Sequence, residues 1–387
     1  MYPTISEFLK SIGIDLPLPI QTFGFFVAIA FGVAAWLLSL EFSRKQKEGV
    51  FQQTVKKSII GAPAAPTDYI ISGIIGFLIG FKILYMALNY SSFVDDPQGT
   101  LLSLKGNIIG GIVVAASLIY WRYRDSKANE LPKLQVATQV LNAKDHVGNI
   151  ILLGVVGGLV GAKIFHNLEN PQEFLRDPVD ALLSFSGLTF YGGLIVASVL
   201  IIRYGIKNKL APLNLVDTAA PALMLCYGIG RIGCQVSGDG DWGIVNLKPK
   251  PGWMSFLPDW MWSYKFPHNV NDVGVPIAEC YGKWCHELPE PVYPTSFYET
   301  VMSVILFLVL WAIRKKIRTP GLLFSIYLIF NGLERFLIES IRVNSLYYIF
   351  GMGITQAQII STLLVITGIV GIWYTRKRAK EVESWKS

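Results

Sequence analysis

The sequence predicts an all-α protein that crosses a membrane several times. Of its 387 residues, 52% are hydrophobic and only 16% are charged, whereas soluble domains carry about 25% charged residues. The apolar residues gather in runs long enough to cross a bilayer as helices, which takes about 20 residues. Basic residues gather between alternate runs, as they do in the cytoplasmic loops of membrane proteins. We therefore expect a polytopic helical protein.

Nine apolar runs are candidates for membrane-spanning helices. Several contain Gly, Ser or Thr, which allow helices to pack closely in a membrane. The runs 108–121 and 188–202 are the shortest of the nine. The nine runs cover residues 20–40, 69–88, 108–121, 147–165, 188–202, 213–236, 297–313, 322–338 and 355–374.

The distribution of charge predicts the orientation. With nine spans and an external N-terminus, 22 of the 34 basic residues fall in cytoplasmic segments and eight fall in external ones. Adding or removing one span scrambles this alternation, so we expect the N-terminus outside and the C-terminus inside. The net charge of +7 is then explained by basic residues that anchor the protein at the cytoplasmic face of the membrane. The sequence has no stripe of basic residues interleaved with aromatic ones, which is the pattern that would indicate a nucleic-acid partner. The first apolar run is long and precedes its positive charges, so we expect no cleavable signal peptide.

One internal repeat is visible. Residues 73–82 and 154–163 share a glycine-rich pattern that ends in Lys, 81 residues apart. Each copy continues through an acidic loop into a helix with a Gly-Gly pair, Gly110-Gly111 or Gly192-Gly193. Repeated helix pairs are common in transporters, but duplication for purely structural reasons explains the pattern equally well.

The repeat and a long external loop divide the chain into five parts. These are an N-terminal segment with the first span (1–66), an extra helix pair (67–124), core helices with the second copy (145–236), a Trp-rich external loop (237–296) and C-terminal core helices with a basic tail (297–387). Cys280 and Cys285 share the external loop, where they either form a disulfide or remain free thiols. A metal site of these two and His286 has too few ligands to be favoured.

The sixth span ends in a glycine-rich segment around Arg231, with Gly230 and Gly233 beside it and Asp239 beyond. An Arg within a span costs about 2.5–3.5 kcal/mol on insertion scales, so we expect an anionic partner. The alternative is that Arg231 extends to the external interface, which lies near this end of the span.

The eighth span carries a second polar set. Tyr327, Asn331, Arg335 and Glu339 recur every four residues and therefore share one helical face, and Arg342 follows them. Arg335 and Glu339 form either a simple intrahelical pair or part of an anion site, because guanidinium groups bind phosphate in a bidentate manner.

The seventh span begins with a third polar set, which includes Tyr298 and Glu299. This set is either an interfacial aromatic anchor with a first-turn acid or part of the same site.

These motifs resemble the prolipoprotein diacylglyceryl transferase family. The resemblance rests on Gly-Arg-x-Gly at 230–233, Tyr-Pro-x-x-x-Tyr-Glu at 293–299 and the set from Gly321 to Arg342. Tyr-Gly-Gly-Leu-Ile at 191–195 and Gln-x-x-Ser at 358–361 are also similar to elements of that family. The sequence departs from the family pattern around Arg231, where Cys234, Gln235 and Ser237 replace the usual residues. Tyr191 stands where the family often has His.

The resemblance implies transfer of the diacylglyceryl group of phosphatidylglycerol to the lipobox cysteine of preprolipoprotein signal peptides, in the bacterial cytoplasmic (inner) membrane. It implies no metal and no other cofactor, and it makes membrane lipid a partner. The expected catalytic residues are Arg231 and Arg335 on the phosphate, Glu339 orienting Arg335, and Tyr191 and Tyr298 positioning the headgroup or relaying a proton. The expected substrate-binding residues are Gly192, Gly193, Gly230, Gly233, Asp239, Glu299, Asn331 and Arg342.

Two other functions remain open from the sequence. A lipid or small-anion transporter, or flippase, is favoured by the repeat and by the charges within spans. A scaffold that binds lipoprotein precursors without catalysis is favoured by the altered residues after Arg231.

Overall fold

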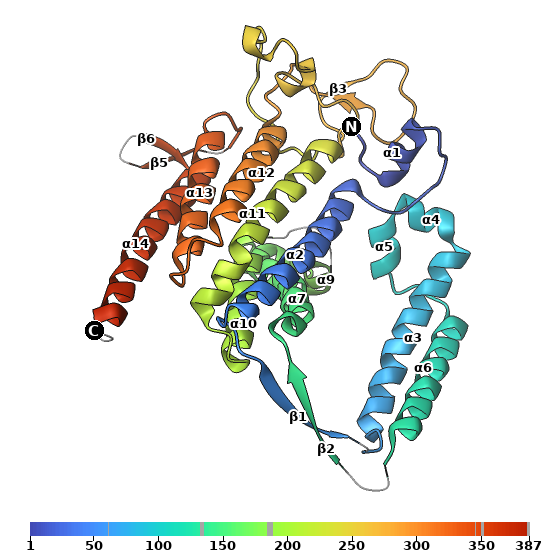
Figure 1. Cartoon of the computed structure of the whole chain (residues 1–387). Helices are drawn as coiled ribbons and strands as arrows, with labels where there is room; N and C mark the ends of the chain where they lie inside the picture. Colours follow the sequence, from blue (N-terminus) through green and yellow to red (C-terminus); the bar gives the residue numbers. More distant parts are fainter. Residues whose placement is uncertain (61, 132–134, 184–188, 345, 350–351, 385–387) are drawn as a thin grey trace. The chain divides into compact units, whose positions relative to one another are not determined.

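The computed structural model describes residues 1–60, 62–131, 135–183, 189–344, 346–349 and 352–384 (Figure 1). The chain forms two compact units. Unit 1 consists of residues 1–16, 20–51 and 205–387, and unit 2 consists of residues 17–19 and 52–204. Each unit is described separately below.

The described residues form a long helix at each of the nine predicted runs, and the prediction of an all-α polytopic membrane protein is confirmed. The start predicted at Leu188 lies outside the described residues. The long helices are α2 (Thr22–Lys47), α3 (Pro66–Leu88), α6 (Ile108–Asn129), α7 (Val147–Glu169), α10 (Phe190–Lys207), α11 (Pro212–Ser237), α12 (Thr295–Ile313), α13 (Leu322–Glu339) and α14 (Gln356–Ser384).

Seven of these helices are long and apolar enough to cross a membrane, within the described part of the chain. The other two, α6 and α13, carry more charge: every 18-residue stretch of either helix contains at least three charged residues. The number of spans and the orientation therefore remain predictions.

Short elements fill the connections. The helices are α1 (Ile5–Ser11), α4 (Tyr90–Asp95), α5 (Pro97–Leu102), α8 (Pro171–Arg176) and α9 (Pro178–Leu183), and the 3-10 turns are Ala143–His146, Gly252–Met254 and Asp259–Met261. The described residues also form three antiparallel strand pairs that the sequence did not predict. They are β1 (Thr54–Ile60) with β2 (Gln135–Leu141), β3 (Val275–Pro276) with β4 (His286–Glu287), and β5 (Leu346–Ile349) with β6 (Met352–Thr355).

The repeat in unit 2 consists of two helix pairs with the same packing. In the first copy α3 lies against α6, and a Cβ on Gly80 would overlap the carbonyl oxygen of Gly110. In the second copy α7 lies against α10, and a Cβ on Gly161 would overlap the carbonyl oxygen of Gly192. Such close approach of backbones is how small residues associate helices in lipid, where there is no hydrophobic driving force between helices. The matched glycines thus have a structural reason in both copies.

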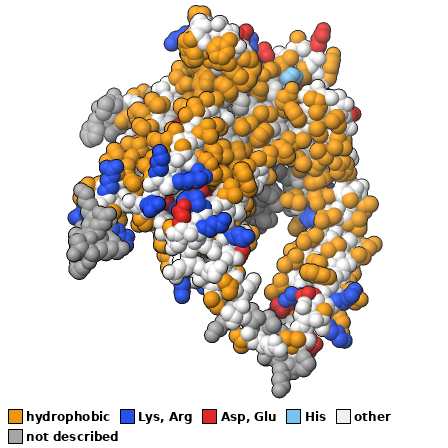
Figure 2. All heavy atoms as spheres, viewed as in Figure 1, with side chains coloured by type: hydrophobic (Ala, Val, Ile, Leu, Met, Phe, Trp, Pro, Cys, Tyr) orange, Lys and Arg blue, Asp and Glu red, His pale blue; other side chains and the backbone are white. Residues whose placement is uncertain are grey.

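The outer faces of the first pair are apolar. Ile74 and Leu78 of α3 are exposed, and Figure 2 shows hydrophobic side chains along the sides of α3 and α6, with charged side chains gathered at one end of the pair. At that end Arg122 of α6 pairs with Asp68 of α3. This distribution suits helices whose sides meet hydrocarbon and whose ends meet water.

In unit 1, α11 is the central helix. It packs against α2, α12 and α13, and α14 packs against α13 (Figure 1). Within its apolar stretch 44% of the residues are buried, against 11% in α2 and α14, so α11 is enclosed by protein. Its Met224 packs in a core with Leu310 of α12 and Leu323 of α13.

Buried carboxylates join the helices of unit 1 at the end opposite Arg231. Asp217 of α11 accepts hydrogen bonds from the backbone N–H groups of Gly321 (2.7 Å) and Phe324 (2.8 Å), which caps the start of α13. Glu41 of α2, 2% exposed, pairs with Arg44 (2.6 Å) and with Arg314 after α12 (2.7 Å). These contacts join α11 to α13 and α2 to the end of α12.

The segment between α11 and α12, residues 238–294, folds into a cap with a small core of its own, which we call the cap segment. Phe266 and Val292 are buried there against Met1 and Trp242. The side chain of Asn269, fully buried, binds backbone groups of Phe266, Val273 and His286. A disulfide joins Cys280 and Cys285, which settles the choice that the sequence left open. The cap segment is therefore ordered by polar and covalent contacts as much as by its core.

We expect Gly161→Ala to destabilise the protein, because the new methyl group would force α7 and α10 apart. Overpacking of this kind costs about 1–3 kcal/mol. The matched control is Gly158→Ala on the same helix, where a Cβ meets nothing within 4 Å. Thermal unfolding in detergent should show a lower midpoint for the first variant only, and equal midpoints for both would contradict this account of the repeat.

Candidate functional site

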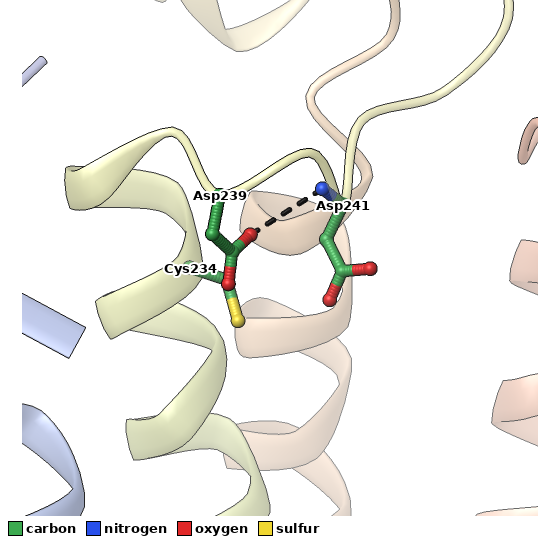
Figure 3. A group of neighbouring side chains, drawn as sticks. All are labelled: Cys234, Asp239 and Asp241. Carbon is green, nitrogen blue, oxygen red and sulfur yellow. Dashed lines mark hydrogen bonds between the residues drawn. The ribbon is translucent and has the colours of Figure 1, made fainter. Parts of the chain in front are cut away.

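The site begins where α11 ends. Gly238 has a φ of +66° and Gly240 a φ of +96°, and both values favour glycine. This turn carries Asp239 and Asp241 back toward the last turn of α11, beside Cys234 (Figure 3). The backbone N–H of Asp241 donates to the side chain of Asp239 at 3.3 Å. The glycine-rich motif thus places two acids next to the helix end.

The backbone around Asp241 connects three helix ends. Gly243 donates to the carbonyl of Tyr293, which precedes α12, at 2.8 Å, and Ile244 donates to the carbonyl of Ile341, which follows α13, at 2.8 Å. A Cβ on Gly243 would crowd these same groups. The hydroxyl of Ser296 on α12 donates to the carbonyl of Asp241 at 3.0 Å. These contacts bring the ends of α11, α12 and α13 together.

Three guanidinium groups converge on one buried carboxylate, that of Glu299 on α12. Its side chain is fully buried. Arg231 of α11 pairs with it, Arg342 donates to it at 3.0 Å, and Arg335 of α13 lies 3.5 Å from it. The hydroxyl of Tyr227 donates to it at 3.0 Å. Glu299 is therefore the hub of the arginine cluster, by which we mean Arg231, Arg335 and Arg342.

Asp241 is the second anchor of the cluster. Its two carboxylate oxygens pair with Arg231 and Arg342. Burial opposes the ionisation of Asp241, but the two guanidinium groups outweigh it and hold the pKa of this carboxyl below its usual value. For Arg342, burial likewise opposes the charge, and Asp241 and Glu299 outweigh it and raise the pKa. Among the described ion pairs, none joins Asp239 to a guanidinium group, and burial raises the pKa of Asp239.

Arg335 has a partner on its own helix as well. Its guanidinium lies 3.2 Å from the carboxylate of Glu339, one turn later. The amide of Asn344 donates to Glu339 at 2.6 Å. The expected pairing of Arg335 with Glu339 is thus present, together with the contact to Glu299.

The expected charged residues therefore meet at one place, but in a way that the sequence did not suggest. Arg231 finds anionic partners within the protein, so the cost of burying it is met without a ligand. Glu299 is buried under the arginines, and this geometry favours an orienting role over direct contact with glycerol hydroxyls. Part of each side chain remains open to a ligand, since Arg231 is 17% and Arg335 is 23% exposed.

Other expected residues lie in different surroundings. The hydroxyl of Tyr298 donates to the carbonyl of Met261 at 2.9 Å, so it ties α12 to the cap segment. Asn331 is half-buried on α13. The glycines differ among themselves: a Cβ on Gly230 meets nothing within 4 Å, whereas one on Gly233 meets Phe26 of α2 at 3.0 Å.

Three of the expected residues belong to unit 2. Tyr191, Gly192 and Gly193 begin α10, and the two glycines pack on α7 through Phe165 and Gly158. Their part in substrate binding or in the reaction remains a prediction.

Three residues of the site were not expected from the sequence. Asp241 lies two residues after Asp239, and nothing in the sequence indicated that it belongs to the site. Tyr227 lies one turn before Arg231, a spacing that would have placed it on the same helical face, and the guanidinium of Arg231 lies over its ring, 5.1 Å from the centroid. Glu334, next to Arg335, is 2% exposed.

Cys234, Asp239 and Asp241 also have the donor types and proximity of a metal site, because their ligand atoms lie within 4.8 Å of one another (Figure 3). Both oxygens of Asp241 are already paired with arginines, and a cation here would be repelled by two fixed positive charges. The geometry therefore makes Asp241 a partner of the arginine cluster.

A model of the prolipoprotein diacylglyceryl transferase family matches residues 108–374. This chain belongs to the prolipoprotein diacylglyceryl transferase family. The match begins at α6, so it covers the second helix of the first copy, the second copy and every residue of the arginine cluster. The protein is therefore a transferase of lipoprotein biosynthesis with several membrane helices.

Two curated relatives show the extent of the similarity. One from Streptococcus agalactiae is 26% identical over 236 residues, which are 60% of this chain and 80% of the relative. One from Streptococcus pyogenes is 24% identical over 283 residues, which are 72% of this chain and 92% of the relative. Both are named phosphatidylglycerol–prolipoprotein diacylglyceryl transferase.

We expect Glu299→Ala to destabilise the protein by about 3–5 kcal/mol, because removing one partner leaves buried arginines without compensation. The control is Glu287→Ala, which breaks a partly exposed pair with Lys265 at 3.7 Å and should cost at most about 1 kcal/mol. Denaturant or thermal unfolding in detergent measures both. Similar losses for the two variants would show that Glu299 is not the hub.

Proposed function

We propose that this protein transfers the diacylglyceryl group of phosphatidylglycerol to the thiol of the lipobox cysteine in the signal peptide of a preprolipoprotein. The products are a thioether and glycerol phosphate, and the enzyme acts in the bacterial cytoplasmic (inner) membrane. The arginine cluster in a chain of this family is the observation that carries the proposal. The relatives' names state the lipid and the protein substrate.

In this proposal Arg231 and Arg335 hold the phosphate of the lipid, and Arg342 supports them. Guanidinium groups bind phosphate oxygens in pairs and stay charged at any physiological pH. Glu299, Asp241 and Glu339 fix the three groups before the lipid arrives, so little reorganisation is needed as charge develops. The open space at Gly230 supports access of the headgroup beside Arg231.

The chemistry makes two demands on the site. Sulfur attacks the glyceryl carbon that bears the phosphate, and the departing group changes from a phosphodiester to a monoester with more negative charge. The arginine cluster answers the second demand by stabilising that charge. The thiol must also lose its proton. Tyr191 and Tyr298 are proposed to position the headgroup or relay a proton. The hydroxyl of Tyr298 also donates a hydrogen bond to the carbonyl of Met261 in the cap segment.

The position of the cap segment outside the cytoplasm is supported by its disulfide. Cys280 and Cys285 are bonded, and disulfides persist mainly in oxidising compartments. With the cap segment outside, the arginine cluster lies near the outer leaflet.

A transporter was favoured by the repeat. Both copies belong to unit 2, whereas the arginine cluster belongs to unit 1, and the matched glycines of the copies serve helix packing. The repeat and the arginine cluster therefore belong to different units of the chain.

We expect Arg231→Ala and Arg335→Ala to lower the rate of thioether formation by at least about 10²-fold, the usual loss when one donor to a developing negative charge is removed. The assay combines purified protein, phosphatidylglycerol and a lipobox peptide. Arg318→Ala, an exposed position after α12, is the control and should retain full activity.

Two results would contradict the proposal. Wild-type protein that forms no thioether would exclude the transferase activity. Full activity of both cluster variants would exclude the assigned residues. Depletion of a native transferase in cells, rescued by wild-type protein but not by either variant, is the matching test in vivo.

A further inference from the structure

Glu334 differs from every other carboxylate described in the site. It lies on α13, one residue before Arg335, and is 2% exposed. Neither of its carboxylate oxygens has a hydrogen-bond partner among the described residues. Glu299, Asp241 and Glu339, in contrast, all pair with guanidinium groups. A buried polar group without a partner is rare in proteins and calls for a functional reason.

The surroundings of Glu334 come from three helices and the turn after α13. Each of these elements carries a charged group or a phenol that interacts electrostatically with Glu334. These groups are Tyr227 and Arg231 of α11, Glu299 of α12, Tyr327 and Arg335 of α13, and Arg342. Glu334 therefore lies beside the arginine cluster, although it pairs with none of its members among the described contacts.

These surroundings favour the neutral form of Glu334. An ionised carboxylate without hydrogen bonds is costly to bury, and the negative charge of Glu299 adds repulsion. The charges of Arg231, Arg335 and Arg342 are already matched by Glu299, Asp241 and Glu339. The site thus holds one buried carboxyl group without a hydrogen-bond partner among the described residues, beside three arginines that already have acidic partners.

The reaction has a use for such a proton. When the carbon–oxygen bond breaks, the oxygen that joined the glyceryl carbon to phosphorus takes the electron pair, and the phosphate gains negative charge. A neutral acid in a low-dielectric site can supply a proton to that oxygen, as other enzymes do with carboxylic acids kept neutral by burial.

We propose that Glu334 is the general acid of the transfer, an inference that rests on the proposed function. Sulfur forms its bond to the glyceryl carbon, the carbon–oxygen bond breaks, and the freed phosphate oxygen takes the proton of Glu334. The thiol proton is released to water, and Glu334 recovers one proton from water before the next turnover.

The test compares two lipid substrates with purified Glu334→Gln. One is phosphatidylglycerol, and the other is its analogue with sulfur in place of the oxygen between the glyceryl carbon and phosphorus. A departing thiophosphate needs no proton, so the variant should be slowed about 10²–10⁴-fold on the oxygen substrate and little on the sulfur substrate. The KM for phosphatidylglycerol should not change. The exposed Glu130→Gln is the matched control.

The dependence on pH separates chemistry from folding. In wild-type protein the ratio of the oxygen rate to the sulfur rate should fall as pH rises and Glu334 loses its proton, because thiol ionisation affects both rates alike. The ratio should not vary with pH in Glu334→Gln, and Glu334→Asp should retain the dependence at a lower rate.

Two results would overturn the inference while leaving the transferase intact: full activity of Glu334→Gln on the oxygen substrate, or equal slowing on both substrates. A wild-type protein that forms no thioether would instead contradict the proposed function, and the role of Glu334 with it.

Discussion

The carboxylate of Glu299, buried beneath three guanidinium groups, is the contact on which the rest of the site depends. Ion pairs of this kind add little net stability, because the cost of removing both charges from water offsets their attraction. Their value here is geometric. Arg231 belongs to α11, whereas Arg335 and Arg342 lie on and just after α13, and one buried anion on α12 holds all three within reach of each other.

This constraint explains features elsewhere in unit 1. The close contact at Gly243 lets the chain after α11 pair with the chain after α13, so that Asp241 faces Arg342. The hydrogen bond from the start of α13 to Asp217 and the ion pair of Glu41 with Arg314 fix the opposite ends of these helices. The cluster is therefore held from both ends of the helix bundle, which keeps the arginines in place before any substrate binds.

The length of the apolar runs was sufficient to predict the long helices, because crossing hydrocarbon leaves the backbone few alternatives. The spacing of Arg335 and Glu339 predicted their contact for the same reason: residues four apart in a helix are neighbours. The repeat was visible in the glycines, and close helix packing explains why they recur.

Contacts between distant segments could not be predicted in this way. The pairing of Glu299 with arginines of α11 and α13 depends on how the helices pack, which no local pattern encodes. Asp241 pairs with Arg231 and Arg342, and no sequence spacing indicates these contacts. The strand pair β1–β2 joins residues about 80 apart in sequence, and each strand is only seven residues long. The disulfide depended on a loop path that spacing alone left open.

The most direct test of the central claim is the affinity of the protein for phosphatidylglycerol in nanodiscs of neutral lipid, measured for wild-type protein, Arg335→Lys and Arg335→Ala. Lysine keeps the charge but loses the bidentate geometry of the guanidinium. If the cluster binds the phosphate, affinity should fall stepwise from wild type to Lys to Ala. Equal affinities for all three proteins would show that the lipid phosphate binds elsewhere and would contradict the account.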